Sequence, residues 1–275
     1  MKPTLNFGGK LVALDRPLII GIINITPDSF YIPSRKNEIS YILSTVADMI
    51  ESGADIIDLG AMSSRPGADI ISLDDELDRI IPAVKAVKKE FPNCILSVDT
   101  IRSEVARRVV ECGASCINDI SGGTYDLEMM SVVGSLKIPY IMMHMQGLPM
   151  DMQLNPTYSD VVVDIMGYFS KQIRRANKAG IHDIIIDPGF GFGKTIEQNY
   201  EIIKNMEAFQ IFDIPILAGV SRKSMIWRPL RIDAANALNG TTALHMFLLS
   251  KGVHMLRVHD VKEAKQCVDL WNLLK

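Results

Sequence analysis

Asp187 closes an apolar run at positions 184–186 and is followed by a proline and a glycine-rich turn. Such a run is typical of a strand buried on both faces, and proline ends the strand because it has no N–H to donate. Glycines at positions 189, 191 and 193 permit positive φ angles and a close approach of backbone to ligand. Thr195 and Gln198 have the capping-box spacing of a following helix. We therefore expect the Asp187 carboxylate at a strand end, facing a ligand.

Polar residues also end the other apolar runs of the chain. They are Asn24, Asp58, Asp99, Asn118, His144, Asp187, Ser221 to Lys223, and Arg257 with His259. A single Asp or Asn in such a place is commonly the N-cap of the next helix. For Asp58 a structural hydrogen-bonding role is favoured over ligand contact. Buried carboxylates need partners. Asp58, Asp99 and Asp187 beside Asn118 therefore indicate a ligand with several N–H donors.

Cations and hydroxyl groups follow some of the same runs. They lie in the segments 63–67 (SSRPG), 221–224 (SRKS) and 257–259 (RVH). Arginine side chains and the N–H groups of a helix N-terminus suit phosphate oxygens. The expected ligand is therefore part anionic and part planar heterocycle.

The elements that position these residues repeat eight times along the chain. Apolar runs cover 18–24, 54–60, 94–99, 115–119, 138–144, 184–187, 214–219 and 254–259. Helical patterns between and after them cover 39–52, 72–91, 103–112, 127–136, 157–179, 196–206, 234–250 and a last segment to 274, with Ser72 and Thr157 as expected caps. Strict alternation implies a parallel sheet, and eight units favour a (β/α)8 TIM barrel over an open doubly wound sheet. We predict a single domain, 1–275, with a short N-terminal segment as a candidate lid hairpin.

Composition excludes several classes of function. A net charge of −3 offers no basic surface for nucleic acid, and no apolar run approaches the roughly 20 residues that span a bilayer. The first residues do not have the pattern of a signal peptide. The four cysteines are expected to be buried free thiols, since the pair Cys112 and Cys116 has no completing partners for a metal site. We expect a reduced, cytoplasmic, soluble protein.

Two other sites are weaker interpretations. The segment 189–195 resembles a P-loop, but it has three residues where that motif has four between the glycine and the glycine-lysine pair. A catalytic zinc site would need more than His144 and His259, the only histidines at strand ends. The fifteen methionines are most simply core residues.

Seven motifs in order along nearly the whole chain resemble the dihydropteroate synthase family. They are the segments 24–30 (NITPDSF), 63–67, 97–100 (SVDT), 118–119 (ND), 187–194 (DPGFGFGK), 221–224 and 257–260 (RVHD). The resemblance implies condensation of 6-hydroxymethyl-7,8-dihydropterin diphosphate with 4-aminobenzoate, which gives 7,8-dihydropteroate and pyrophosphate. It also implies a homodimer formed through the 234–250 end of the chain, and sulfonamides as competitive analogues of aminobenzoate.

The resemblance also implies roles for individual residues. The pterin would be held by Asp99, Asn118, Asp187 and Lys223, with Arg257 stacked on its face. Mg²⁺ bound by Asn24 would bridge to the diphosphate, assisted by Arg65 and His259. The aminobenzoate pocket would be formed by Phe30, Pro66, Phe192 and Ser224, and Ser64 would supply a hydroxyl to the substrates. The implied catalytic residues are Arg65, Lys223, Arg257 and His259.

Residue chemistry agrees with these roles. A carboxylate accepts paired N–H donors such as those of an aminopyrimidine edge, and a metal and arginine stabilise charge on a departing diphosphate. The electron-rich pterin can share the positive charge on its methylene carbon, so we expect a largely dissociative displacement without an obligatory general base.

The chain departs from the family pattern near its N-terminus. Ile32 stands where the family has an aspartate in the first loop, and Ala61-Met62 replaces a glycine-glutamate pair. Two alternatives stay open. One is a pterin-dependent methyltransferase that needs a corrinoid partner, and the other is a pterin-binding paralogue without synthase activity.

Overall fold

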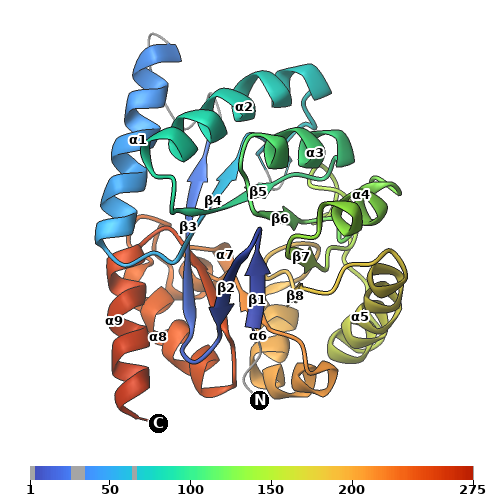
Figure 1. Ribbon diagram of the computed structural model, residues 1–275. Helices are drawn as coiled ribbons and strands as arrows, with labels where there is room; N and C mark the ends of the chain where they lie inside the picture. The colour runs from blue at the N-terminus through green and yellow to red at the C-terminus, as the bar shows by residue number, and fades with distance from the viewer. Residues whose placement is uncertain (1–3, 26–34, 64–66, 275) are drawn as a thin grey trace.

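The computed structural model describes residues 4–25, 35–63 and 67–274. Parallel strands form a barrel with helices on its outside (Figure 1). The eight strands of this sheet are β3 (Leu18–Asn24), β4 (Ile56–Gly60), β5 (Ile95–Asp99), β6 (Cys116–Asp119), β7 (Tyr140–Met143), β8 (Ile184–Asp187), β9 (Leu217–Ala218) and β10 (Met255–Val258). They pair in the order β8-β7-β6-β5-β4-β3-β10-β9. The predicted (β/α)8 barrel is confirmed.

The barrel closes between β8 and β9. Ile186 forms a parallel bridge with Ile216, and the Ile186 amide donates to the Pro215 carbonyl at 2.9 Å. Because Pro215 has no N–H and β9 has only two residues, this joint has less backbone pairing than the others in the described chain.

Nine α-helices surround the strands in the described residues. They are α1 (Arg35–Glu51), α2 (Leu73–Glu90), α3 (Ser103–Glu111), α4 (Met129–Leu136), α5 (Val161–Lys178), α6 (Ile196–Lys204), α7 (Ser224–Leu230), α8 (Leu238–Ser250) and α9 (Val261–Leu273). Their apolar faces pack on the strands in one core cluster that includes Ile42, Val84, Phe169 and Leu248. None of the described helices is long and apolar enough to cross a membrane.

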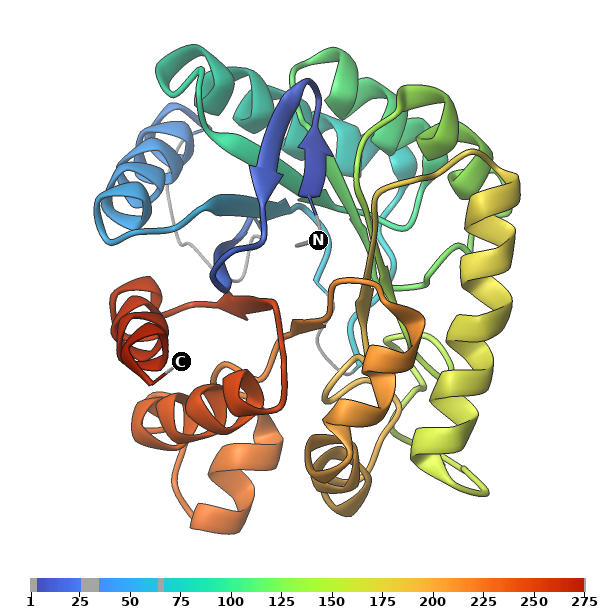
Figure 2. The same ribbon diagram turned by 60° about the horizontal axis from the view of Figure 1, so that its bottom comes forward.

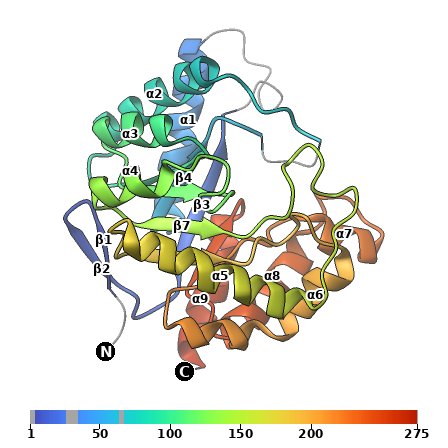
Figure 3. The same ribbon diagram turned by 90° about the vertical axis from the view of Figure 1, so that its right-hand side faces the viewer.

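A hairpin of β1 (Thr4–Phe7) and β2 (Lys10–Ala13) confirms the predicted N-terminal hairpin. Leu5 and Phe7 pack with Leu18, Ile95 and Met255, which lie at the amino ends of their strands. Figure 2 shows the hairpin across one end of the barrel, and Figure 3 shows it on the opposite side from α7. It therefore covers the floor of the barrel rather than the end where the predicted site residues lie, so the expectation that it forms a lid was wrong.

Several predicted boundaries were wrong. Asp160, not Thr157, caps α5, because its carboxylate accepts from the amides of Val162 and Val163. The segment between the predicted strand at 214–219 and the predicted helix at 234–250 contains α7, and the following helix begins at Leu238 rather than at 234. By contrast, the Ser72 cap and the Thr195–Gln198 capping box are confirmed.

Candidate active site

Arg257 connects two buried carboxylates at the barrel mouth, the end formed by the last strand residues and those that directly follow them. Its Nε donates to Asp58 Oδ2 at 2.7 Å and its Nη2 donates to Asp99 Oδ2 at 3.0 Å. Asp58 lies within β4, Asp99 ends β5, and Arg257 belongs to β10, so the contacts join three strands. The two ion pairs fix the plane of the guanidinium group.

Asn118 belongs to the same network. Its Nδ2 donates to Asp58 Oδ2 at 3.0 Å, the oxygen that also accepts from Arg257. The amide oxygen of Asn118 therefore remains to accept a hydrogen bond from a ligand. Asp58 is fully buried and contacts other site residues, which agrees with the structural role predicted for it.

The carboxyl group of Asp99 has a pKa near neutral pH. Burial raises the pKa of Asp99 to about 7, an effect that Arg257 opposes and the Asp58 charge reinforces. Ligand N–H donors would stabilise the charged form of this carboxylate. The site is thus suited to a partner that supplies hydrogen bonds where water is excluded.

Asp187 lies at the end of β8, as predicted, at the start of the glycine turn (residues 188–193). The Gly189 amide donates to Asp187 Oδ1 at 2.8 Å. Gly189 has φ +72°, and a Cβ there would lie 2.0 Å from the His144 carbonyl oxygen, so only glycine fits. Burial raises the pKa of Asp187, while Lys223 opposes this shift.

Lys223 faces the glycine turn from the other side of the barrel joint. Its Nζ donates to the Phe190 carbonyl at 2.5 Å and lies 4.6 Å from the centre of the Phe192 ring. Burial lowers the pKa of Lys223 to about 8, and Asp187 opposes this shift. A cation, an aromatic face and a carboxylate thus come together from β8 and from the segment after β9.

The segment 221–224 is held in place by Arg222, which is not directed at the site. Arg222 donates to both carboxylate oxygens of Asp260 at 2.8 Å, and also to the Ala234 carbonyl at 3.0 Å. Its φ of 53° turns the chain so that Lys223 and Arg222 diverge. Ser224 is the first residue of α7. Of the two cations in this segment, Arg222 therefore pairs with Asp260, and Lys223 contacts the glycine turn.

His259 contacts Ser221 through two atoms. Its amide donates to Ser221 Oγ at 3.2 Å, and its Nδ1 lies 3.2 Å from the same oxygen. Burial, followed by the charge of Arg257, lowers the pKa of His259 to about 4, so the imidazole is neutral at pH 7. It can donate one hydrogen bond to an anionic ligand without carrying charge.

Among the predicted strand-end residues, the His144 side chain is not part of the candidate site. His144 is buried, its ring packs edge-on against Tyr168 at 4.8 Å, and burial lowers its pKa to about 2. Asn24 ends β3 and is partly exposed. The predicted site residues Phe30, Ser64, Arg65 and Pro66, and the departure at Ile32, lie outside the described residues.

Sequence reasoning missed two features of the site. One is the contact set of Lys194, whose buried ammonium donates to backbone carbonyls. The other is an apolar cluster at the mouth, in which Met62, Ile101, Ile120 and Met143 join the predicted Phe192. Each of these residues ends a strand or follows one closely, and this position was the available signal.

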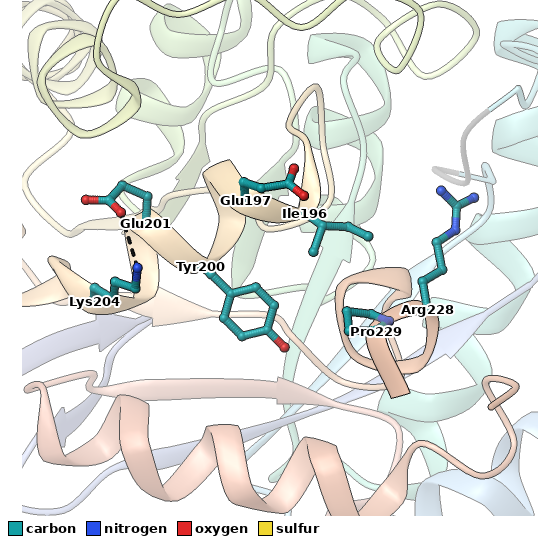
Figure 4. A pocket seen from close by; sticks show the side chains of 7 residues that line it. All are labelled: Ile196, Glu197, Tyr200, Glu201, Lys204, Arg228 and Pro229. Atoms are coloured by element: carbon teal, nitrogen blue, oxygen red, sulfur yellow. Dashed lines mark ion pairs between the residues drawn. The ribbon is translucent and has the colours of Figure 1, made fainter. Parts of the chain in front are cut away.

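Two hollows lie on the outer surface, away from the mouth. One, of about 620 Å³, lies between α6 and α7 and is lined by residues such as Tyr200, Glu201, Lys204 and Arg228 (Figure 4). Among its charged groups, Glu201 and Lys204 pair with each other, and the Arg228 guanidinium lies 5.3 Å from the centre of the Trp227 ring. Since it contains no strand-end residue, it is not a candidate for the chemistry described above.

The residues present fit a magnesium ion only in part. Among the described residues, no group of three His, Cys, Asp or Glu side chains stands close enough to hold a metal. Asn24 offers one amide oxygen at the mouth, and Mg²⁺ is commonly bound by one or two protein ligands together with phosphates and water. A metal here would therefore depend on the oxygens of an anionic substrate.

Comparisons with known proteins agree with this arrangement. A family model described as "Pterin binding enzyme" matches residues 20–259. The dihydropteroate synthase of Escherichia coli K12 is 39% identical over 262 residues, which cover 94% of this chain and 92% of that protein. The structure of Yersinia pestis dihydropteroate synthase with a sulfonamide drug complex superposes with a TM-score of 0.92 at 36% identity, covering 100% and 99% of the two chains. That of Xanthomonas albilineans dihydropteroate synthase with 4-aminobenzoic acid gives 0.91 at 34% identity, covering 100% and 98%.

Proposed function

The chain belongs to the dihydropteroate synthase family of pterin-binding enzymes, and we propose that it joins 6-hydroxymethyl-7,8-dihydropterin diphosphate to 4-aminobenzoate by a largely dissociative displacement of pyrophosphate. The observation that supports this most is the network of Arg257 with Asp58, Asp99 and Asn118, which shares one mouth with Asp187 and Lys223.

The pterin is bound by its hydrogen-bonding edges. Asp187 and Asp99 accept from its N–H groups, Asn118 accepts through its free amide oxygen, and Lys223 donates to a ring acceptor. The two ion pairs of Arg257 hold its guanidinium plane in advance, so stacking on the pterin costs little side-chain entropy. Because the carboxylates are buried, a pterin that supplies their hydrogen bonds is favoured over water.

The leaving diphosphate requires positive charge and hydrogen-bond donors. Arg65 and Ser64 belong to a segment beyond the described residues, and neutral His259 donates to a phosphate oxygen from the end of β10. Asn24 would hold Mg²⁺, which supplies neutralisation of the charge that develops on the diphosphate. These groups stabilise departure rather than attack, which is the requirement of a dissociative displacement.

The aminobenzoate lies beside the glycine turn. Phe192 presents a largely buried ring beneath Lys223, and Ser224 offers a hydroxyl at the start of α7. Phe30 and Pro66 complete this pocket in our proposal. An aniline nitrogen is unprotonated at pH 7, so it can attack the methylene carbon without a general base, and sulfonamides, which share its shape, would compete for the pocket.

The test is pyrophosphate release by purified protein given the pterin diphosphate, 4-aminobenzoate and Mg²⁺. Release should need all three additions, and it should fall by at least about 100-fold in Asp187→Ala and Lys223→Ala. Lys204→Ala in the outer hollow is the matched control and should keep full activity, because Lys204 pairs only with Glu201. No release with calorimetric pterin binding intact would instead support a paralogue that binds pterin without synthase activity.

We also propose a homodimer formed through α8 and α9. A second outer hollow, of about 790 Å³, lies between these helices and is lined in part by Leu238, Met246 and Leu270. Leu270, which lines this hollow, is 57% exposed. Sedimentation at micromolar concentration should give twice the mass of one chain, and Leu270→Glu should give the monomer. A cytoplasmic location stays a prediction from the free thiols.

A further inference from the structure

Lys194 is a buried cation that the proposed reaction does not use. Its side chain is 3% exposed, and its Nζ donates to the carbonyls of Gly189 and Phe192, both at 2.9 Å, and of His144 at 3.3 Å. All three acceptors are backbone groups, so the ammonium is saturated by the chain itself. It has no N–H left to offer a substrate.

Burying this ammonium costs desolvation free energy, which its three hydrogen bonds to backbone carbonyls offset. Burial lowers the pKa of Lys194 to about 7, which shows the cost of the charge in this place. An apolar side chain of similar length would fill the same space without that cost. The effect of the charge is structural, because the carbonyls of His144, Gly189 and Phe192 all accept from the one ammonium.

The backbone that Lys194 holds carries three contacts of the candidate site. The Gly189 amide orients Asp187, the Phe190 carbonyl accepts from Lys223, and the Phe192 ring lies under the Lys223 ammonium. The bond to His144 ties the same turn to the end of β7. Lys194 thus supports the turn from within, while Lys223 contacts it from the mouth.

We propose that Lys194 is a positioning residue that fixes the glycine turn and thereby sets the affinity for both substrates. The proposal rests on the substrate roles given above to Asp187, Lys223 and Phe192. It assigns Lys194 no part in bond making or breaking, so its removal should change binding constants more than turnover.

The experiment compares Lys194→Met with Lys88→Met. Lys88 is a matched control, because its Nζ also donates to backbone carbonyls, those of Pro92 and Cys94, both at 2.8 Å, before β5 and away from the mouth. We expect Lys194→Met to raise KM for both substrates and the calorimetric Kd for the pterin diphosphate by about tenfold, with kcat within about threefold of the parent. Lys88→Met should leave all of these constants unchanged.

A second variant removes a weaker support of the same turn. Tyr158 donates its hydroxyl to the Gly193 carbonyl at 2.7 Å, so Tyr158→Phe should raise the same constants by about twofold to threefold in a protein that keeps its fold. If Lys194→Met does not fold, Tyr158→Phe still tests whether the glycine turn sets substrate affinity, and unchanged constants in it would overturn the proposal.

Each result separates this proposal from the proposed function. Unchanged KM and Kd in Lys194→Met, with a loss of thermal stability like that of Lys88→Met, would show a purely structural lysine and overturn it. So would a fall in kcat alone. Failure of the parent to release pyrophosphate would contradict the synthase reaction, yet the pterin Kd of the variants would still test Lys194.

Discussion

At the scale of single residues, one carboxylate oxygen joins two side chains of the proposed pterin site. Asp58 Oδ2 accepts from both Arg257 and Asn118. Asp58→Asn keeps the shape but removes the charge, so we expect a loss of about 1.5–3 kcal/mol in unfolding free energy and weaker pterin binding, measured by denaturation and calorimetry.

Asp55→Asn is a matched control for that substitution. Asp55 also pairs with an arginine, Arg16, and accepts from the Ile19 amide, but it lies at the amino end of the strands. It should cost similar stability and leave the pterin Kd unchanged. Equal pterin affinities in both variants would contradict the organising role of Asp58.

The pH dependence of pterin binding follows from two shifted groups. Asp99, with a pKa of about 7, must lose its proton to accept hydrogen bonds, so binding strengthens as pH rises through that value. Lys223, with a pKa of about 8, must keep its proton to donate, so binding weakens as pH rises further. Calorimetry should show a maximum between these values.

The Asp58→Asn variant tests whether Asp99 causes the weakening of pterin binding at low pH, the acidic limb of the profile. Since the charge of Asp58 raises the pKa of Asp99, its removal should move this limb to lower pH and leave the alkaline limb in place. A profile that is flat from pH 6 to pH 9 would contradict both assignments.

Residue types and spacing predicted which side chains meet at the mouth, but not how each is directed. Asp99, Asn118, Asp187 and Lys223 converge as expected, because the ends of parallel strands meet at one face. Arg222 adjoins Lys223 in sequence and yet turns to Asp260, since its positive φ reverses the local direction of the chain. Backbone angles of this kind leave no mark in a residue pattern.

At the scale of elements, two helical glycines should respond oppositely to alanine. Gly167 in α5 has no atom within 4 Å of an added Cβ, so Gly167→Ala should stabilise the protein by about 0.5–1 kcal/mol. In α4, a Cβ on Gly134 would lie 1.9 Å from the Ala179 carbonyl oxygen, so Gly134→Ala should destabilise it. Thermal denaturation of both variants checks this, and equal effects would contradict the packing described here.

Periodicity identified the elements better than their ends. Strand β9 was expected over 214–219 but spans only Leu217–Ala218, since Pro215 cannot donate to a ladder. Helix α7 was missed because it is short and contains Pro229, which read as loop.

At the scale of the whole molecule, the hairpin packs on the floor of the barrel, and the candidate site lies at the opposite end. Phe7 is 3% exposed in the hairpin that covers the floor, so Phe7→Ala should cost about 3–5 kcal/mol of unfolding free energy without changing KM. Leu11, 72% exposed on the same hairpin, is the control, and Leu11→Ala should be nearly neutral. A raised KM in Phe7→Ala would show that the two ends are coupled.

The architecture as a whole was predictable because it depends on alternation alone. Eight buried runs separated by amphipathic helices admit few arrangements, and the helix caps at Ser72 and Thr195 follow local rules. Where the ring closes could not be predicted, because closure depends on contacts between segments that no local pattern specifies.

The joint between β8 and β9 has one further consequence. Its sparse backbone pairing predicts that local opening costs less free energy here than at the other joints of the described strands. Asp187 lies on one side of it and Lys223 on the other, so a pterin bound to both spans the opening. We therefore expect a bound pterin to favour the closed barrel, because it would contact residues on both sides of the joint.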